Sequence, residues 1–133
     1  MRVLNEPELD AALRERGWEV IHPEQLALAE QIRLFHTRDV ICGLAGSAFH
    51  TAIFAGPRGR RIVLSVEDQV NSNFHLFDLL MGRPSEYYRV EDVALVEDLG
   101  PDHVGTDAQR FARTYAFGDP AALADALTRL IRA

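Results

Sequence analysis

The stretch EQIRLFHTRDVICGLAGSAFHTAIFAGP, residues 30–57, contains the pattern that decides the fold. The apolar run 40–42 predicts a short buried strand, and residues 47–55 predict a helix that ends at Gly56 and Pro57. Between them lies Gly43-Leu44-Ala45-Gly46. A Gly-x-x-Gly segment that joins a strand to a helix is a common phosphate site in α/β folds, because the backbone can approach closely and helix N–H groups face the ligand.

The same alternation of helix and strand patterns continues on both sides of this stretch. Asn5 is expected to cap the first helix, with Glu8 completing a capping box, and Asp119-Pro120 is expected to start the last helix. Helices are predicted over about 5–17, 26–37, 47–55, 73–81 and from 119 onward, and strands over 18–22, 40–42, 60–66 and, broken, within 87–96. Ser47 is the expected cap of the third helix. Residues 100–106 are rich in turn formers and are expected to be exposed.

This alternation predicts the α/β class, as a small Rossmann-like three-layer domain with a mostly parallel sheet of three or four strands. A chain of 133 residues is expected to form one domain over residues 1–133. An incomplete sheet of this kind leaves an exposed edge, which a partner chain or a second copy could cover.

Composition narrows the function classes. The chain has 14 basic and 20 acidic residues and a net charge of −6, which disfavours a general nucleic-acid binder. No apolar run approaches the roughly 20 residues that a transmembrane helix needs. The N-terminus lacks the apolar core of a signal peptide. The single cysteine, Cys42, has no partner for an internal disulfide, and cytoplasmic localisation is expected.

The residue types give no metal centre and no hydrolase site. The histidines show no metal-ligand spacing, so no bound metal is expected. Gly-Leu-Ala-Gly-Ser, ending at Ser47, is not the Gly-x-Ser-x-Gly nucleophile elbow. Cys42 lies within an apolar run and is expected to be a buried, inert thiol.

The order of the motifs resembles the C-terminal domain of glycosyltransferase family 61, which includes bacterial capsular-polysaccharide biosynthesis proteins. The resemblance covers roughly residues 2–90. The matching segments are Arg2-Val3-Leu4-Asn5-Glu6, Gly17-Trp18-Glu19-Val20-Ile21 with Pro23-Glu24, Leu28-Ala29-Glu30-Gln31 with Leu34-Phe35, and Val40-Ile41-Cys42-Gly43 continuing to Phe54.

The resemblance implies one half of a two-domain, GT-B-like enzyme that binds a nucleotide-sugar and transfers the sugar to a hydroxyl of a saccharide acceptor. It implies no cofactor beyond the donor substrate and no active-site metal. Glu30 and Gln31 would then lie near the donor, and residues 43–47 would approach its phosphates. Asn5 and Glu6 correspond to an Asn-Glu pair of the family. The donor-binding candidates are Glu30, Gln31, Gly43, Gly46, Ser47 and His50, with Asn5, Glu6 and Asn71 as secondary candidates.

The chain departs from the family pattern in ways that bear on catalysis. Ala45 stands where the family usually has a histidine before the glycine, and alanine can neither donate to phosphate nor transfer a proton. His50, in the first turns of the following helix, could replace that histidine. Family members are also much longer, so the chain is expected to lack an N-terminal domain and to provide half of a cleft.

Each candidate also has a structural alternative. The two glycines could only permit a tight turn, Glu30 could be a solvated carboxylate, and His50 could be packed or capping. The polar segment 68–73, with Asn71, could contact a base or sugar beyond the end of a strand, or be a solvated connector. Two functions therefore stay open: a glycosyltransferase-type domain that a second domain completes, and a non-catalytic binding or assembly module derived from one.

Overall fold

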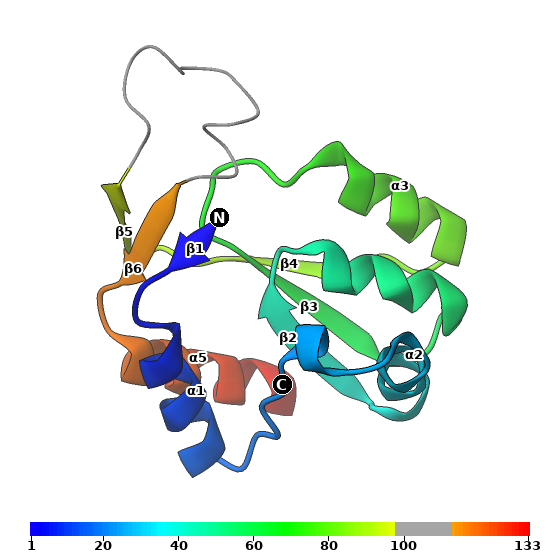
Figure 1. The fold of residues 1–133 in the computed structure, drawn as a ribbon, viewed down its shortest axis with the longest axis horizontal. Coiled ribbons are helices and arrows are strands. Elements are labelled where there is room, and N and C mark those ends of the chain that lie inside the picture. Colours follow the sequence, from blue (N-terminus) through cyan, green and yellow to red (C-terminus); the bar gives the residue numbers. More distant parts are fainter. Residues whose placement is uncertain (98–112) are drawn as a thin grey trace. The chain divides into compact units, whose positions relative to one another are not determined.

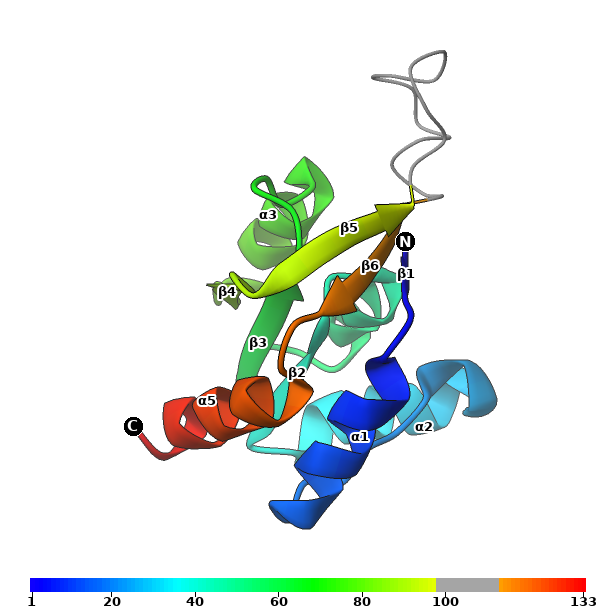
Figure 2. The same cartoon turned by 90° about the vertical axis from the view of Figure 1, so that its left-hand side faces the viewer.

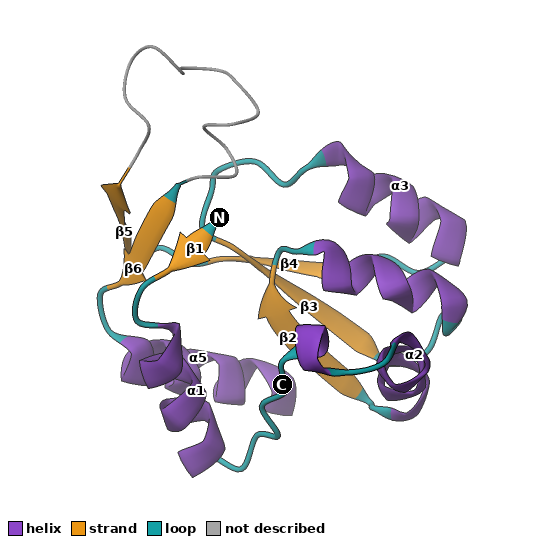
Figure 3. Cartoon of the chain, viewed as in Figure 1, coloured by secondary structure: helices purple, strands orange, loops and turns teal. Residues whose placement is uncertain are grey.

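The computed structural model describes residues 1–97 and 113–133, which form two compact units (Figure 1). Unit 1 joins Met1–Val20 to Glu91–Ala133, and unit 2 is Ile21–Val90. The α/β class with mostly parallel strands is confirmed, but the strands form two three-stranded sheets, one in each unit, instead of one (Figure 3). The expectation of one domain over residues 1–133 stays a prediction.

Unit 2 is built on a parallel sheet in the order β2-β3-β4. Its strands are β2 (Val40–Leu44), β3 (Arg60–Ser65) and β4 (Glu86–Arg89), and its helices are η1 (Pro23–Gln25), α2 (Leu28–Thr37), η2 (Ser47–Phe54) and α3 (Ser72–Met81). The central strand β3 has no alternation of apolar and polar residues because both of its faces are covered: Ile62 and Val63 are 0% exposed.

The core of unit 2 joins η2, β3 and α3 through Phe49, Val63 and Phe74. The ring of Phe35, on α2, meets Phe49 edge-on with 6.0 Å between ring centroids. Because η2 contacts both α2 and α3, the segment that the sequence singled out lies at the centre of this unit.

Unit 1 holds the sheet β1-β6-β5 and two helices (Figure 2). Its elements are β1 (Arg2–Val3), α1 (Glu6–Glu15), β5 (Val93–Glu97), β6 (Thr114–Phe117) and α5 (Pro120–Arg132). The central strand β6 pairs in parallel with β1 and antiparallel with β5. Because β1 and β6 pair, the segments nearest the two ends of the chain share one sheet.

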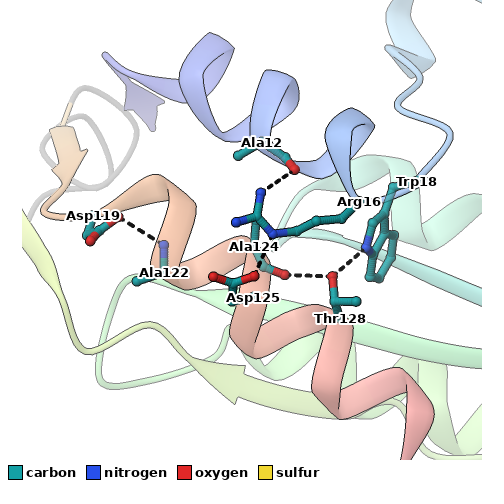
Figure 4. A network of polar contacts seen from close by, with 8 residues as sticks. All are labelled: Ala12, Arg16, Trp18, Asp119, Ala122, Ala124, Asp125 and Thr128. Atoms are coloured by element: carbon teal, nitrogen blue, oxygen red, sulfur yellow. Dashed lines mark hydrogen bonds and ion pairs between the residues drawn. The ribbon is translucent and has the colours of Figure 1, made fainter.

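Helices α1 and α5 pack side by side and are joined by polar side chains (Figure 4). Arg16 Nε donates to Asp125 Oδ1 at 2.7 Å, and Trp18 Nε1 donates to Thr128 Oγ1 at 3.0 Å. The predicted start of α5 is confirmed, since Asp119 Oδ1 accepts from the Ala122 N–H at 2.9 Å.

Asn5 precedes α1 as predicted, but the predicted capping box is wrong, because the Asn5 side chain makes no cap hydrogen bond. Asn5 Nδ2 donates to the Phe117 carbonyl at 2.8 Å, and Asn5 Oδ1 accepts from the Phe117 N–H at 2.9 Å. The amide thus pairs with both polar groups of one main-chain residue of β6, as a neighbouring strand would.

Several local predictions differ from the structure. Residues 18–22 form no strand, residues 87–96 contribute to two strands in different sheets, and β1 and β6 were not predicted. Residues 47–54 form a 3-10 helix preceded by Gly46 at the N-cap, so the expected cap by the Ser47 side chain is wrong. The predicted exposed turn at 100–106 lies outside the described residues.

Candidate functional site

The carboxyl end of the β2-β3-β4 sheet is where the helices η2 and α3 begin. β2 ends at Leu44 and η2 starts at Ser47, while β3 ends at Ser65 and α3 starts at Ser72. The Ala45 N–H donates to the Leu64 carbonyl at 2.8 Å and extends the ladder one residue beyond β2. Two helix N-termini therefore follow parallel strands at the edge where α/β sheets bind ligands.

The two glycines of the Gly-x-x-Gly segment have different surroundings, and neither adopts a positive φ. Gly43 lies within β2, and a Cβ there would meet the Phe49 ring at 3.4 Å, so its missing side chain leaves room for that ring. Gly46 is extended, with φ −156° and ψ 167°, and a Cβ there would be 3.6 Å from the Leu44 carbonyl oxygen. A left-handed turn is thus not the reason for either glycine.

The first turn of η2 presents main-chain donors. The Phe49 N–H donates to the Gly46 carbonyl at 3.2 Å. Within residues 1–97 and 113–133, no hydrogen bond uses the N–H groups of Ser47 or Ala48. The Ser47 side chain is exposed beside them. Free N–H groups and a hydroxyl at a helix start can bind an anion.

His50 packs between η2 and α3. Its ring stacks on Phe77 with 4.2 Å between centroids and 12° between planes, and it also contacts the Phe74 ring at 5.1 Å. In the described part of the chain, the buried Nε2 atom has no hydrogen-bond partner. Burial lowers the pKa of the His50 imidazole, which favours the neutral ring. These contacts favour the packed role; contact with a phosphate stays a prediction.

Gln31 reaches η2, but its amide has partners within the protein. Gln31 Nε2 donates to the carbonyls of Pro23 at 2.9 Å and Leu26 at 3.2 Å, and Gln31 Oε1 accepts from Thr51 Oγ1 at 3.5 Å. The side chain therefore ties the η1 turn to α2 and η2. Glu30 is exposed in the first turn of α2, where its carboxylate remains in solvent.

The secondary candidates are divided between the units. Asn71 is the N-cap of α3, and its Oδ1 accepts from the Asn73 N–H at 2.9 Å. Asn5 and Glu6 belong to unit 1, where Asn5 pairs with Phe117 and Glu6 is exposed at the start of α1. Seven of the nine candidates thus belong to unit 2: Glu30, Gln31, Gly43, Gly46, Ser47, His50 and Asn71.

The sequence did not reveal a buried polar network at the amino end of the same sheet. Arg61 is 3% exposed and donates to the Arg83 carbonyl and, at 3.4 Å, to Ser85 Oγ. Asp78 accepts from Ser85 Oγ at 2.7 Å and from the Tyr87 hydroxyl at 2.6 Å. Burial lowers the pKa of Arg61, and burial together with Asp78 raises that of Tyr87. The one sequence signal of this network is Arg61, a charged residue that directly precedes the apolar residues 62–64 of β3.

Burial raises the pKa of the Cys42 thiol to about 12, from an ordinary value of 9.0. The thiol stays protonated in the folded state while it ionises in the unfolded state above about pH 9. Its contribution to the free energy of unfolding is therefore complete below about pH 9 and is lost as the pH rises towards 12.

Cys42→Ala should consequently reduce the alkaline loss of stability. Urea unfolding at about pH 7.5 and about pH 10.5 should show a larger drop for the wild type than for the variant. Equal drops would mean that the thiol is not protected by burial.

No group of three or more His, Cys, Asp or Glu side chains in residues 1–97 and 113–133 could hold a metal ion. In the same residues, no helix combines the length and the apolar character that crossing a membrane requires.

Comparison with known proteins gives one family. No curated protein and no solved structure matches the chain. Residues 1–63 of the 133-residue chain match the family model described as Glycosyltransferase 61. The match starts at the N-terminus, includes all of η2 and ends within β3, whereas the extension of the resemblance to about residue 90 stays a prediction. The match supports a glycosyltransferase-type function for this part of the chain.

Proposed function

We propose that the chain is a nucleotide-sugar-binding domain of the glycosyltransferase type, related to the bacterial capsular-polysaccharide enzymes and acting in the cytoplasm. The observation that carries the proposal is the start of η2, at the carboxyl end of β2. There the N–H groups of Ser47 and Ala48 follow Gly46 and have no acceptor within residues 1–97 and 113–133. The family match includes this segment. The missing side chain of Gly46 leaves the donors open to a diphosphate.

In this proposal the protein stabilises the leaving nucleoside diphosphate. Negative charge that develops on the diphosphate faces the N–H groups and the positive end of the helix dipole. Ser47 adds a hydroxyl donor, and Glu30 and Asn71 are the exposed side chains that could orient the sugar or base. A second domain or a partner chain supplies the saccharide acceptor side and the base that deprotonates its hydroxyl. Asn5 and Glu6, which belong to unit 1, remain secondary candidates for donor binding.

The test is calorimetric titration of the chain with UDP, GDP, CDP and their sugar conjugates. One nucleotide should bind saturably, and Gly46→Val should weaken that binding by about tenfold or more, because the added methyl groups cover the N–H donors. The fold should tolerate valine, since Gly46 is extended and the nearest atom to a Cβ is 3.6 Å away. Ala94→Val, which adds the two methyl groups of valine to an exposed position of β5, is the control.

Two outcomes contradict the proposal. If no nucleotide binds at millimolar concentration while the chain is folded, the domain has no working donor site. If Gly46→Val binds as the wild type does, the site is elsewhere.

The internal contacts of Gln31 and His50 favour a second candidate. Both side chains are expected near the donor. However, Gln31 donates to main-chain carbonyls, and the His50 ring stacks on Phe77. We infer as the alternative a non-catalytic binding or assembly module that pairs with a partner chain or forms a homodimer. This candidate predicts no nucleotide binding, with an association in sedimentation experiments that Gly46→Val leaves intact.

A further inference from the structure

The amino end of the β2-β3-β4 sheet gathers arginines. Unit 2 has as many arginines as acidic residues, so the net charge of −6 resides in the residues of unit 1. Within unit 2 most of the arginines nevertheless lie on α2 and its C-cap or in the segments that lead into β3 and β4. Those near this end are Arg33, Arg38, Arg58, Arg60, Arg61 and Arg83.

Contacts show that these segments are adjacent. The Arg60 N–H donates to the Asp39 carbonyl at 2.7 Å, and a Cβ on Gly59 would lie 2.6 Å from the Arg38 carbonyl oxygen. Arg61 donates to the Arg83 carbonyl, which brings the segment after α3 to the start of β3.

Two of the three acidic residues at this end have partners, whereas the third, Asp39, is exposed. Glu86 forms a bidentate pair with Arg60, at 2.8 and 2.9 Å. Asp78 accepts from Ser85 and Tyr87. The exposed side chains of Arg58 and Arg83 form no ion pair within the described residues, and Arg83 acts on Glu86 only at longer range. Both add positive charge to the surface.

The same end exposes large apolar side chains. Leu79 is 80%, Phe54 69% and Leu80 63% exposed. The stack of His50 on Phe77 holds η2 and α3 side by side, and Phe54 and Leu80 follow those two residues by about one helical turn. Figure 1 shows α3 and the unlabelled helix below it, η2, ending at the same side of unit 2.

We propose that this amino-end surface, formed by Phe54, Arg58, Leu79, Leu80 and Arg83, docks unit 2 on an anionic phospholipid bilayer. Exposed apolar side chains next to cationic ones suit the boundary between headgroups and acyl chains: the apolar groups insert and the arginines bind lipid phosphates. An acidic soluble partner would match the arginines alone. The surface lies at the opposite end of the parallel sheet from the start of η2, so docking does not depend on the proposed donor site.

The test is cosedimentation of the full chain with vesicles of pure phosphatidylcholine or with about 30% phosphatidylglycerol added. The chain should bind the anionic vesicles and lose binding as salt is added. Combining Phe54→Ser, Leu79→Ser and Leu80→Ser should lower the partition coefficient by about tenfold or more. Combining Arg58→Gln and Arg83→Gln should lower it by about tenfold. All five positions are exposed, so the variants should fold.

Matched controls use exposed residues of unit 1. Leu95→Thr with Val96→Thr, on β5, and Arg14→Gln with Arg132→Gln should bind vesicles as the wild type does.

The proposal is overturned if the wild type does not cosediment with anionic vesicles. It is also overturned if the control variants lose as much vesicle binding as the variants of the amino-end surface. Binding to a soluble polyanion such as heparin without vesicle binding would also overturn it, as would self-association through these residues without vesicle binding. Gly46→Val should bind vesicles normally, so a failed donor site and a failed membrane site give different results.

Discussion

Gly59→Ala is expected to lower the free energy of unfolding by about 3 kcal/mol or more. Gly59 has φ +66°, and a Cβ there would lie 2.6 Å from the Arg38 carbonyl oxygen and 3.1 Å from that of Asp39. Both obstacles are main-chain atoms that cannot rotate away. The loop also cannot withdraw easily, because the Arg60 N–H donates to the Asp39 carbonyl at 2.7 Å.

Urea unfolding of Gly59→Ala and Gly82→Ala separates steric overlap from backbone strain. Gly82 closes α3 with φ +65°, but no atom lies within 4 Å of its added Cβ. This control should lose only about 1 kcal/mol, which is the left-handed strain alone. Equal losses in the two variants would show that the loop at Gly59 moves freely away from Arg38.

Asp78→Ala is expected to cost about 3 kcal/mol, because one carboxylate serves a buried network. Its removal leaves the hydroxyls of Ser85 and Tyr87 without their acceptor. It also takes away the negative charge that acts on Arg61, a guanidinium that is 3% exposed. A buried cation that has lost its counter-charge is destabilised far more than an exposed one.

Asp68→Ala is the matched control for Asp78→Ala. Asp68 also pairs with an arginine, Arg89, at 3.0 Å, but its side chain is 93% exposed. Its loss should change the free energy of unfolding by about 0.5 kcal/mol or less. If both variants lose the same amount in urea unfolding, the network around Asp78 contributes no more than a surface ion pair.

Elements that are determined by neighbouring residues in the sequence could be predicted. Asp119 and Pro120 start α5 where expected, because capping and a fixed proline φ act within one turn. β2 was predicted from its apolar run, and β3 from the β-branched residues within the alternating stretch 60–66. In contrast, Trp18 was read as part of a strand, although its ring nitrogen donates to Thr128 and so belongs to a loop that packs on α5. That partner is 110 residues away and leaves no local pattern.

The candidate site shows the same limit. The sequence placed Gly46 and Ser47 correctly between a parallel strand and a helix, since glycine and serine signal such a junction locally. It could not show that Gln31 serves the carbonyls of Pro23 and Leu26, or that His50 stacks on Phe77. These contacts are set by how helices pack, and they decide which side chains remain available to a ligand.

Unit 1 combines residues 1–20 with residues 91–133, and this division sets an order of events during synthesis. Asn5 leaves the ribosome long before Phe117, which lies 112 positions later and holds its amide. At about 5–20 residues per second, the first strand waits several seconds for β6, whereas all strands of residues 21–90 are already available. We therefore expect the inserted unit to fold first, and a nascent chain that stops before β6 should contain a formed unit 2 and an unpaired N-terminal segment.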